Sequence, residues 1–422
     1  DRTVHPHYYE IQKIYQDVWF AEENLRNGKI RIQNHFDFTN LNRYEFRWQV
    51  EAGGQVMQSG KLEPVSLAPH QSSVITVPIN DIQPKGKEWV LKVGVHLKEE
   101  TKWAPAGFCI AREHFILREY DYPEMQASAK ATVSVTKETN KILLTAGEYK
   151  VVLDRNDGSL LSYKIEDREL IRHPLEPYFW KVPNDNQERN QYEQRLGPWK
   201  FAGKRRSVTD VQTEQPASGL VLVKFAMKLP PWDADYQLAY SFNASGMLQI
   251  ESAYEPGAND MPLLPKFGMR LAIPQHYSNI QWYGRGPHEN YQDRKHSALL
   301  GLYEQSLCDF ITPYISPQDN ANRCDVRWVR FTDSHGTGLK FAGLQPLSFR
   351  AWPYTEEDLE QAGHNYQLPS RNLININLDL IVHGVGGSNS WSKRTLPQYT
   401  IDGNQPYSYG FIIKPVIRPN HQ

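Results

Sequence analysis

Alternation of apolar and polar residues is the feature that most constrains what this chain can fold into. It is clean over residues 29–38, 43–50 and 89–97. On an extended backbone successive side chains point to opposite faces, so each of these stretches predicts a strand with one buried face. The apolar positions of the first stretch are Ile30, Ile32, Phe36 and Phe38.

Turn signals separate these predicted strands. Asn27-Gly28 precedes the first strand and Gly53-Gly54 follows the second. Both pairs suit the tight turns that join antiparallel strands. Strands at this spacing over about 100 residues are typical of an immunoglobulin-like sandwich. We therefore expect such a sandwich over residues 18–121, followed by a linker over residues 122–132.

The alternation resumes in the remainder of the chain, residues 133–422. Further apolar faces lie at residues 221–229, 248–254 and 374–382. One short helix is expected over residues 356–362, with Thr355 as its N-cap and Gly363 after its end. Because no long amphipathic helices alternate with the strands, a parallel α/β sheet is disfavoured. The pattern predicts a second all-β domain of many antiparallel strands, too large for a simple sandwich.

The opening residues 1–17 fit neither domain. Tyr8, Ile11, Ile14 and Tyr15 recur at helical spacing behind Pro6. This pattern predicts an amphipathic helix. We interpret it as the remnant of a helix and linker that leave a domain lying upstream.

Composition excludes several classes of partner and site. The 47 Lys and Arg residues balance 48 Asp and Glu residues, so nothing in the charge attracts nucleic acid or an anionic membrane. No apolar run approaches the roughly 20 residues of a membrane helix, and residues 1–7 show no signal peptide. Three cysteines without a CxxC pair argue against thiolate metal sites. We expect a soluble protein, cytoplasmic or periplasmic.

Three segments are richer in polar and aromatic residues than a sheet requires, namely residues 283–294, 312–323 and 384–391. In the first segment, Arg285, Glu289 and Arg294 are expected to connect loops through ion pairs and hydrogen bonds. We expect the polar residues of the second segment to have a structural role as well. The third is a glycine-rich stretch ending in Trp391, which could offer its indole face to a sugar, although packing is the commoner role of a loop tryptophan.

Catalytic carboxylates cannot be assigned from spacing. Glycoside hydrolysis requires two carboxylates roughly 5 to 10 Å apart, and nothing here nominates such a pair. Glu289 and Asp293 are four residues apart, but a salt-bridged or solvated loop is the simpler interpretation. No HExxH, Walker or GxSxG motif is present, and His288 and His364 are isolated. We therefore assign no catalytic residue and no metal ligand.

The runs YGRGPHENYQDR, TPYISPQDNANR and GVGGSNSW closely resemble the C-terminal domain of glycoside hydrolase family 2 β-galactosidases. The opening DRTVHPHYYEIQKIYQ is similar to the segment by which those enzymes leave their catalytic (β/α)8 barrel. The resemblance implies an immunoglobulin-like β-sandwich followed by a large antiparallel β-supersandwich with a galactose mutarotase-like fold. The catalytic barrel is absent from this chain.

The resemblance also implies retaining hydrolysis of terminal β-D-galactosides. In the family the catalytic glutamates, and the Mg and Na sites beside them, belong mainly to the barrel. This portion is therefore expected to be inactive alone and to hold no cofactor. Its expected partners are a β-galactoside, the upstream barrel of the same enzyme and other copies of the protein in a homo-oligomer.

Individual site residues follow from the same resemblance. Trp391 matches the tryptophan that stacks on the sugar in the family. Asn184, Asp185 and Asn186 resemble a segment at the site entrance, although the chain departs from the best-known members after Asn186. Three alternatives remain open: a free-standing carbohydrate-binding module, a mutarotase-like sugar epimerase and a purely structural or oligomerisation role.

Overall fold

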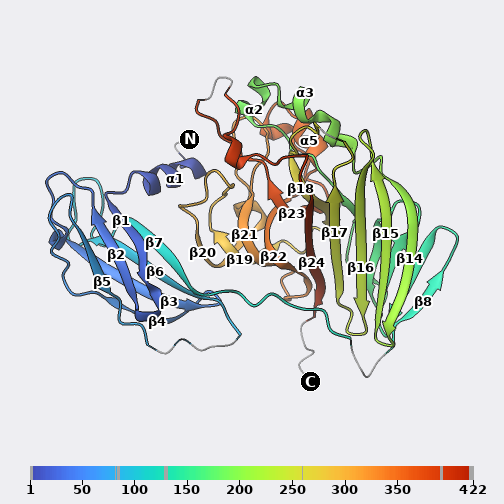
Figure 1. Cartoon of the computed structure of the whole chain (residues 1–422), viewed down its shortest axis with the longest axis horizontal. Coiled ribbons are helices and arrows are strands. Elements are labelled where there is room, and N and C mark those ends of the chain that lie inside the picture. The colour runs from blue at the N-terminus through green and yellow to red at the C-terminus, as the bar shows by residue number, and fades with distance from the viewer. Residues whose placement is uncertain are drawn as a thin grey trace. The chain divides into compact units, whose positions relative to one another are not determined.

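The computed structural model describes residues 3–80, 82, 86–127, 132–258, 260–389 and 393–417. Strands dominate this part of the chain, which confirms the all-β class (Figure 1). Two compact units are distinguished. The first comprises residues 1–121, 283–286 and 294–303, and the second comprises the other residues. The predicted boundaries placed residues 283–286 and 294–303 in the second domain, whereas the structure groups both segments with the first unit.

The first unit contains two antiparallel sheets, ordered β1-β2-β5 and β4-β3-β6-β7. Its elements are α1 (Pro6–Ile14), β1 (Val18–Asn24), η1 (Leu25–Asn27), β2 (Lys29–Asn34), η2 (Leu41–Arg43), β3 (Tyr44–Ala52), β4 (Gln55–Lys61), β5 (Ser72–Thr76), β6 (Trp89–Leu97) and β7 (Cys109–Arg118). Two sheets of this kind form the predicted sandwich.

Alternate side chains of the first unit form its core. Trp48 lies opposite Val93 and Val50 opposite Leu91 in the β3–β6 register, and all four are buried. Gly53 and Gly54 join β3 to β4 with φ of 57° and 82°. Positive φ at both positions is what a two-residue hairpin turn requires, and glycine adopts it without steric cost.

The first predicted strand is too long. It was expected to reach Phe38, but β2 ends at Asn34 and Phe38 is 96% exposed. The Asn34 side chain is the physical reason. Its Nδ2 donates to Thr39 O at 2.9 Å and to Leu67 O at 3.0 Å. With the Phe36 N–H, which donates to Asn34 Oδ1 at 3.0 Å, these bonds form a local turn that takes the backbone away from the sheet, while Asn34 itself stays paired with Val18.

The helix predicted in the opening residues is present as α1. Its apolar stripe is exposed rather than buried: Tyr8, Ile11 and Ile14 are each at least half accessible. Glu10, one helical turn before Ile14, is only 6% exposed. The helix therefore packs in the first unit through polar side chains, including Glu10, Gln12 and Lys13, and leaves these apolar side chains exposed.

The second unit is one continuous antiparallel sheet that curls on itself. Its elements are β8 (Ser134–Lys137), β9 (Lys141–Ala146), β10 (Tyr149–Asp154), β11 (Leu160–Ile165), β12 (Arg168–Glu169), β13 (His173–Pro177), α2 (Asp185–Arg189), α3 (Tyr192–Leu196), η3 (Gly197–Phe201), β14 (Ser207–Ala217), β15 (Leu220–Leu229), β16 (Ala234–Asn243), β17 (Leu248–Glu255), β18 (Lys266–Ile273), α4 (Leu307–Phe310), β21 (Arg323–Thr332), β22 (Gly338–Trp352), α5 (Glu356–Gln361), η4 (Asn365–Gln367), β23 (Ile374–Val382), η5 (Pro397–Tyr399) and β24 (Tyr407–Val416). Strands β19 (Asn279–Gly286) and β20 (Leu299–Ser306) have residues in both units.

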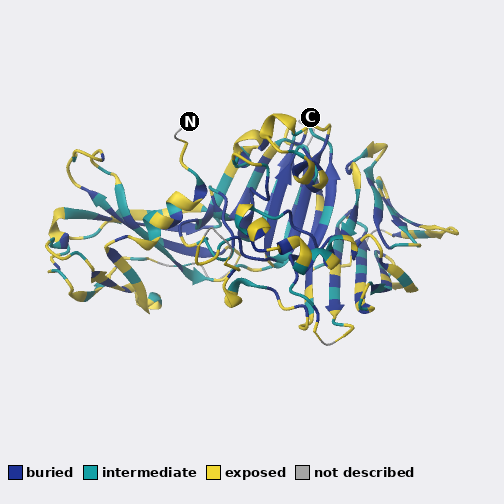
Figure 2. Ribbon diagram, turned by 90° about the horizontal axis from the view of Figure 1, so that it is seen from above, coloured by how far each residue is buried: buried dark blue, intermediate teal, exposed yellow. Residues whose placement is uncertain are grey.

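Central strands of this sheet are buried on both faces. Strands β18, β22 and β23 pair side by side and appear dark blue along most of their length in Figure 2. Phe267 on β18 lies among the aromatic rings of Phe179, Tyr254 on β17 and Tyr409 on β24. The predicted helix at residues 356–362 is confirmed as α5, with Thr355 as its N-cap.

Candidate functional site

Residues 384–387 leave the end of β23 and form the centre of the candidate site. The backbone N–H of Gly386 donates to Asp293 Oδ2 at 2.6 Å. The Thr395 hydroxyl donates to Gly384 O at 3.1 Å and to Gly386 O at 2.9 Å. A Cβ added at Gly384 would lie 2.8 Å from Asp293 Oδ2, so only glycine permits this close approach. The stretch is therefore held from both sides.

The predicted site-entrance residues begin α2. Asn184 is its N-cap: Oδ1 accepts from Gln187 N at 3.0 Å, and Gln187 Oε1 accepts from Asn184 N at 3.2 Å. The same two side chains donate onward, Asn184 to Val385 O at 2.8 Å and Gln187 to Gly384 O at 3.0 Å. The segment is thus fixed to the glycine-rich stretch.

Gln187 is a site residue that the sequence analysis missed, because there it counted only as a departure from the family pattern. Asn followed three residues later by Gln is a capping-box signal, and that signal could have found it. Of the other two predicted residues, Asp185 accepts from Gln318 Nε2 at 3.3 Å. The half-buried Asn186 side chain makes no hydrogen bond to the described residues.

The first and second motifs interlock beside this stretch. Glu289, only 1% exposed, accepts from Ala321 N at 2.6 Å and from the Tyr314 hydroxyl at 2.7 Å. Asn290 Oδ1 accepts from Cys324 N at 2.9 Å. Since Asp293 of the first motif also binds Gly386, the structure brings residues of all three sequence motifs together in the second unit.

Trp391, the predicted sugar-stacking residue, lies outside the described residues, as do its neighbours at 390 and 392. The chain is described up to Asn389 and again from Lys393. Its contact with a sugar therefore stays a prediction.

A buried chain of ion pairs underlies the motifs. Arg350 donates to Asp319 at 2.6 Å and to Asp379 at 3.0 Å. Asp379 also accepts from Lys266 at 2.7 Å. Burial raises the pKa of Asp379, and burial lowers that of Lys266 to about 8 although Asp379 opposes the change. The Tyr291 hydroxyl donates to Asp319 at 2.6 Å, which joins the first motif to the network.

Lys181 is a second fully buried ammonium. Its Nζ donates to Gln187 Oε1 at 2.6 Å and to Val182 O at 3.3 Å, and both acceptors are neutral. Burial lowers the pKa of Lys181 to about 8, with the carboxylate of Asp319 acting in the opposite sense. A buried positive charge therefore lies directly behind the N-terminal turn of α2.

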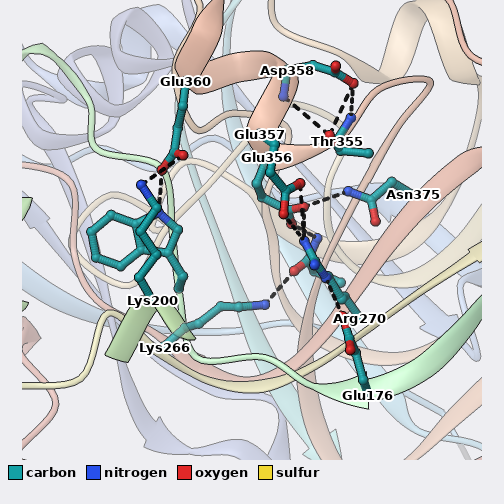
Figure 3. Close-up of polar contacts among 12 residues, drawn as sticks. Glu176, Lys200, Lys266, Arg270, Thr355, Glu356, Glu357, Asp358, Glu360 and Asn375 are labelled. Carbon is teal, nitrogen blue, oxygen red and sulfur yellow. Dashed lines mark hydrogen bonds and ion pairs between the residues drawn. The ribbon is translucent and has the colours of Figure 1, made fainter. Parts of the chain in front are cut away.

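Arg270 on β18 is the centre of a separate carboxylate cluster (Figure 3). It donates to Glu176 at 2.9 Å and to Glu356 and Glu357 at 3.1 Å each. Burial alone would raise the pKa of Glu356, but Arg270 and then Lys266 hold it below its ordinary value. No sequence pattern predicted this cluster, since residues 356 and 357 were interpreted only as the start of a helix.

A pocket of about 390 Å³ adjoins this cluster. It is lined by His173, Glu176, Lys204, Arg270 and Glu357, among others. Arg270 pairs with Glu176 of β13 and with Glu356 and Glu357 of α5, so it anchors α5 to the sheet and holds these carboxylates in ion pairs.

Among the described residues, no group of three or more His, Cys, Asp and Glu side chains is placed to hold a metal ion. Nor is any helix in that part of the chain both long and apolar enough to cross a membrane.

Comparison with known sequence families gives two matches. The family described as beta galactosidase small chain matches residues 145–413, and domain 4 of beta-galactosidase matches residues 30–118. A beta-galactosidase of Priestia megaterium is 32% identical over 418 residues, and one of Lactobacillus delbrueckii subsp. bulgaricus is 28% identical over 419 residues. Both alignments cover 99% of this chain but only 40% of the relative, so the chain spans about 40% of the length of these relatives.

Similar solved structures include a galactose 1-epimerase from Lactobacillus acidophilus NCFM. It shares 9% identity with a TM-score of 0.39, over 68% of this chain and 99% of the epimerase. A GH36 α-galactosidase from Geobacillus stearothermophilus shares 8% identity with a TM-score of 0.38, over 67% of this chain and 40% of that enzyme.

Proposed function

The chain belongs to the beta galactosidase small chain family, and from this premise we propose that it is the C-terminal portion of a retaining β-galactosidase of glycoside hydrolase family 2. The observation that carries the proposal is that 99% of this chain aligns with 40% of the length of each of two beta-galactosidases. In this proposal the whole enzyme hydrolyses terminal β-D-galactosides. Its two catalytic glutamates come from an upstream barrel, as the family resemblance implies.

This portion completes the sugar pocket. The stretch at residues 384–387 is fixed by Asp293, Asn184, Gln187 and Thr395, and it leads directly to Trp391. A rigid approach reduces the entropy lost when a side chain is ordered against a ligand. We assign to Trp391 the stacking of its indole face on the C–H face of a pyranose.

The upstream barrel is the proposed partner of the first unit. The exposed stripe of Tyr8, Ile11 and Ile14 on α1 is the kind of apolar surface that a neighbouring domain covers. Mg and Na are assigned to the barrel as well. The described residues of this chain do not fit a metal ion, so neither ion enters any step assigned here.

The proposal is tested with the full-length protein and with this chain alone. The full-length protein should hydrolyse lactose, and NMR should show the β anomer of galactose as the first product, because two displacements retain configuration. This chain alone should release no galactose. Release of the α anomer first, or hydrolysis by this chain alone, would contradict the proposal.

A free-standing carbohydrate-binding module and a mutarotase-like epimerase are the other candidates. A module would bind galactose or lactose in calorimetry with no upstream domain present. An epimerase would need an acid and a base free in one cleft. The cleft beside Arg270 holds its carboxylates in ion pairs, and the pKa of Glu356 is lowered rather than raised toward neutrality.

A further inference from the structure

A pocket of about 740 Å³ lies in the second unit between the α2–α3 segment and the residues that follow β23. Ligand sites for small molecules commonly have volumes of about 300 to 1,000 Å³. Its lining includes Asn190, Tyr192, Arg195, His383, Lys393 and Arg394.

The charge of this pocket is of one sign. Arg195, Lys393 and Arg394 line it, and none of its described lining residues is a carboxylate. Arg195 Nε donates to Asn190 O at 3.1 Å and its NH2 group to the Asn190 side chain, so its partners are neutral. Burial and then the nearby guanidinium of Arg394 lower the pKa of Arg195. Three like charges therefore line one space without a counter-charge among its described lining residues.

Tyr192 and His383 add uncharged polar groups to the lining. The Tyr192 hydroxyl is buried and has no hydrogen-bond partner in the described part of the chain. His383 Nδ1 lies 2.9 Å from Gly384 O. A carbonyl can only accept, so Nδ1 carries the proton and Nε2 is left as an acceptor. Burial lowers the pKa of His383 to about 4, and the ring is neutral near pH 7.

Leaving a buried hydroxyl unpaired costs about 1 to 3 kcal/mol, and gathering cations without anions is also unfavourable. A ligand that brings an anion and hydroxyl groups would offset both costs. Guanidinium groups suit planar or tetrahedral oxyanions. Tyr192 and His383 suit an alcohol, because the Tyr192 hydroxyl can donate or accept a hydrogen bond and His383 Nε2 can accept one.

We propose that this pocket binds a saccharide that carries an anionic group. The anion lies against Arg195 and Arg394, and a sugar hydroxyl lies between Tyr192 and His383. The anionic group is a carboxylate or a phosphate, which share this recognition chemistry. The inference concerns equilibrium binding by this chain, so its test does not depend on the proposed hydrolysis.

The test is isothermal titration calorimetry on the chain with D-galacturonate, D-galactose 6-phosphate and D-galactose at low and high ionic strength. Binding of one or both acidic sugars, weakened by salt and at least about tenfold tighter than binding of D-galactose, is expected. Preferential binding of D-galacturonate would identify the anionic group as a carboxylate, and preferential binding of D-galactose 6-phosphate would identify it as a phosphate. Equal affinities for D-galactose and both acidic sugars, or no binding of either acidic sugar, would overturn the proposal.

Variants distinguish binding in this pocket from non-specific electrostatic attraction of an anion to the protein. Arg394→Gln changes an exposed side chain and Arg195→Gln a half-buried one, and each should weaken the acidic sugar at least about tenfold. Lys150→Gln removes an equal charge from the exposed side of β10 and should leave affinity unchanged. If Lys150→Gln weakens binding as much as Arg394→Gln does, the attraction is non-specific and the pocket is not the site.

Tyr192→Phe tests the sugar half of the site. It should weaken the acidic sugars but leave the affinity for inorganic phosphate unchanged, because phosphate alone needs only the guanidinium groups. Arg195→Lys keeps the charge and should recover part of the affinity lost in Arg195→Gln. An unaltered affinity of the acidic sugars for Tyr192→Phe would contradict the placement of the sugar hydroxyl.

Discussion

Asp293 and Gly386 are 93 residues apart in sequence, yet the Asp293 carboxylate accepts a 2.6 Å hydrogen bond from the Gly386 backbone. A hydrogen bond of this kind, from an amide to a charged acceptor, is among the stronger ones in proteins. It joins the motif at residues 283–294 to the stretch that leads to Trp391. The candidate site depends on this connection.

Asp293→Ala should loosen residues 384–387 and lower the free energy of unfolding by about 1.5 to 3 kcal/mol, because a bond to a charged group is lost. Amide hydrogen exchange should quicken at Gly386. Asp210→Ala, on the exposed edge of β14, serves as the matched control and should change neither measurement. An unchanged exchange rate at Gly386 would show that the bond does not fix the stretch.

Arg350→Met should destabilise the second unit by about 3 to 5 kcal/mol, because it leaves Asp319 and Asp379 buried without their shared cation. Denaturant unfolding measures the loss. Arg31→Met breaks the exposed pair with Glu23 and should cost no more than about 1 kcal/mol. Similar losses for the two variants would mean that the buried network contributes no more than a surface pair.

Glu10 should make stability fall in acid. Burial alone would raise its pKa, but hydrogen bonds from His296 and Ser297 lower it to about 2 from 4.5. A depressed carboxyl pKa stabilises the fold above the unfolded value and loses that contribution as pH falls through the folded value. After allowance for solvent screening of this partly solvated carboxyl, about 1 to 2 kcal/mol should therefore be lost between pH 4.5 and 2.

Thermal melting of the wild type and of Glu10→Gln across this range measures the effect. The variant should show a smaller decline, since its side chain does not titrate. Parallel melting curves at every pH would rule out a contribution from Glu10.

Gly28→Ala should destabilise the first unit by more than about 1 kcal/mol. Gly28 has φ of +65°, and an added Cβ would lie 2.2 Å from Val77 O. Gly107→Ala is the control: it also has positive φ, +82°, but its Cβ would meet nothing closer than 3.9 Å. The difference in melting temperature between the two variants therefore isolates the steric clash from the cost of the backbone conformation.

Trp391→Ala in the full-length protein should raise KM for lactose several-fold, because the indole would no longer cover the sugar face. Trp391→Phe should recover part of the loss, since a smaller aromatic ring still stacks. Steady-state kinetics on lactose provides the measurement. Kinetics identical to the wild type would remove Trp391 from the sugar site.

Much of the fold was predictable because the alternation of apolar and polar residues along a strand directly reflects which of its two faces is buried. Residues 43–50 and 89–97 became β3 and β6, and residues 374–382 became β23, each near its predicted bounds. The helix α5 was predictable because its capping signal is local. The predicted strand to Phe38 failed because the competing bonds of Asn34 involve Leu67, which is 33 residues away.

The site was less predictable than the fold. The three motifs were visible as unusual sequence, but the pairing of Glu289 with Ala321 and of Asp293 with Gly386 was not. Gln187 was missed, and the cations around the 740 Å³ pocket come from segments about 200 residues apart.

The sequence by itself determined which segments are strands, where the main turns lie and which family the chain resembles, because these depend on neighbouring residues and on ordered motifs. Only the tertiary structure decided which charges meet, which are paired and which are left facing a pocket. Electrostatic energies depend on distance and burial, and both are properties of the folded chain rather than of residue order.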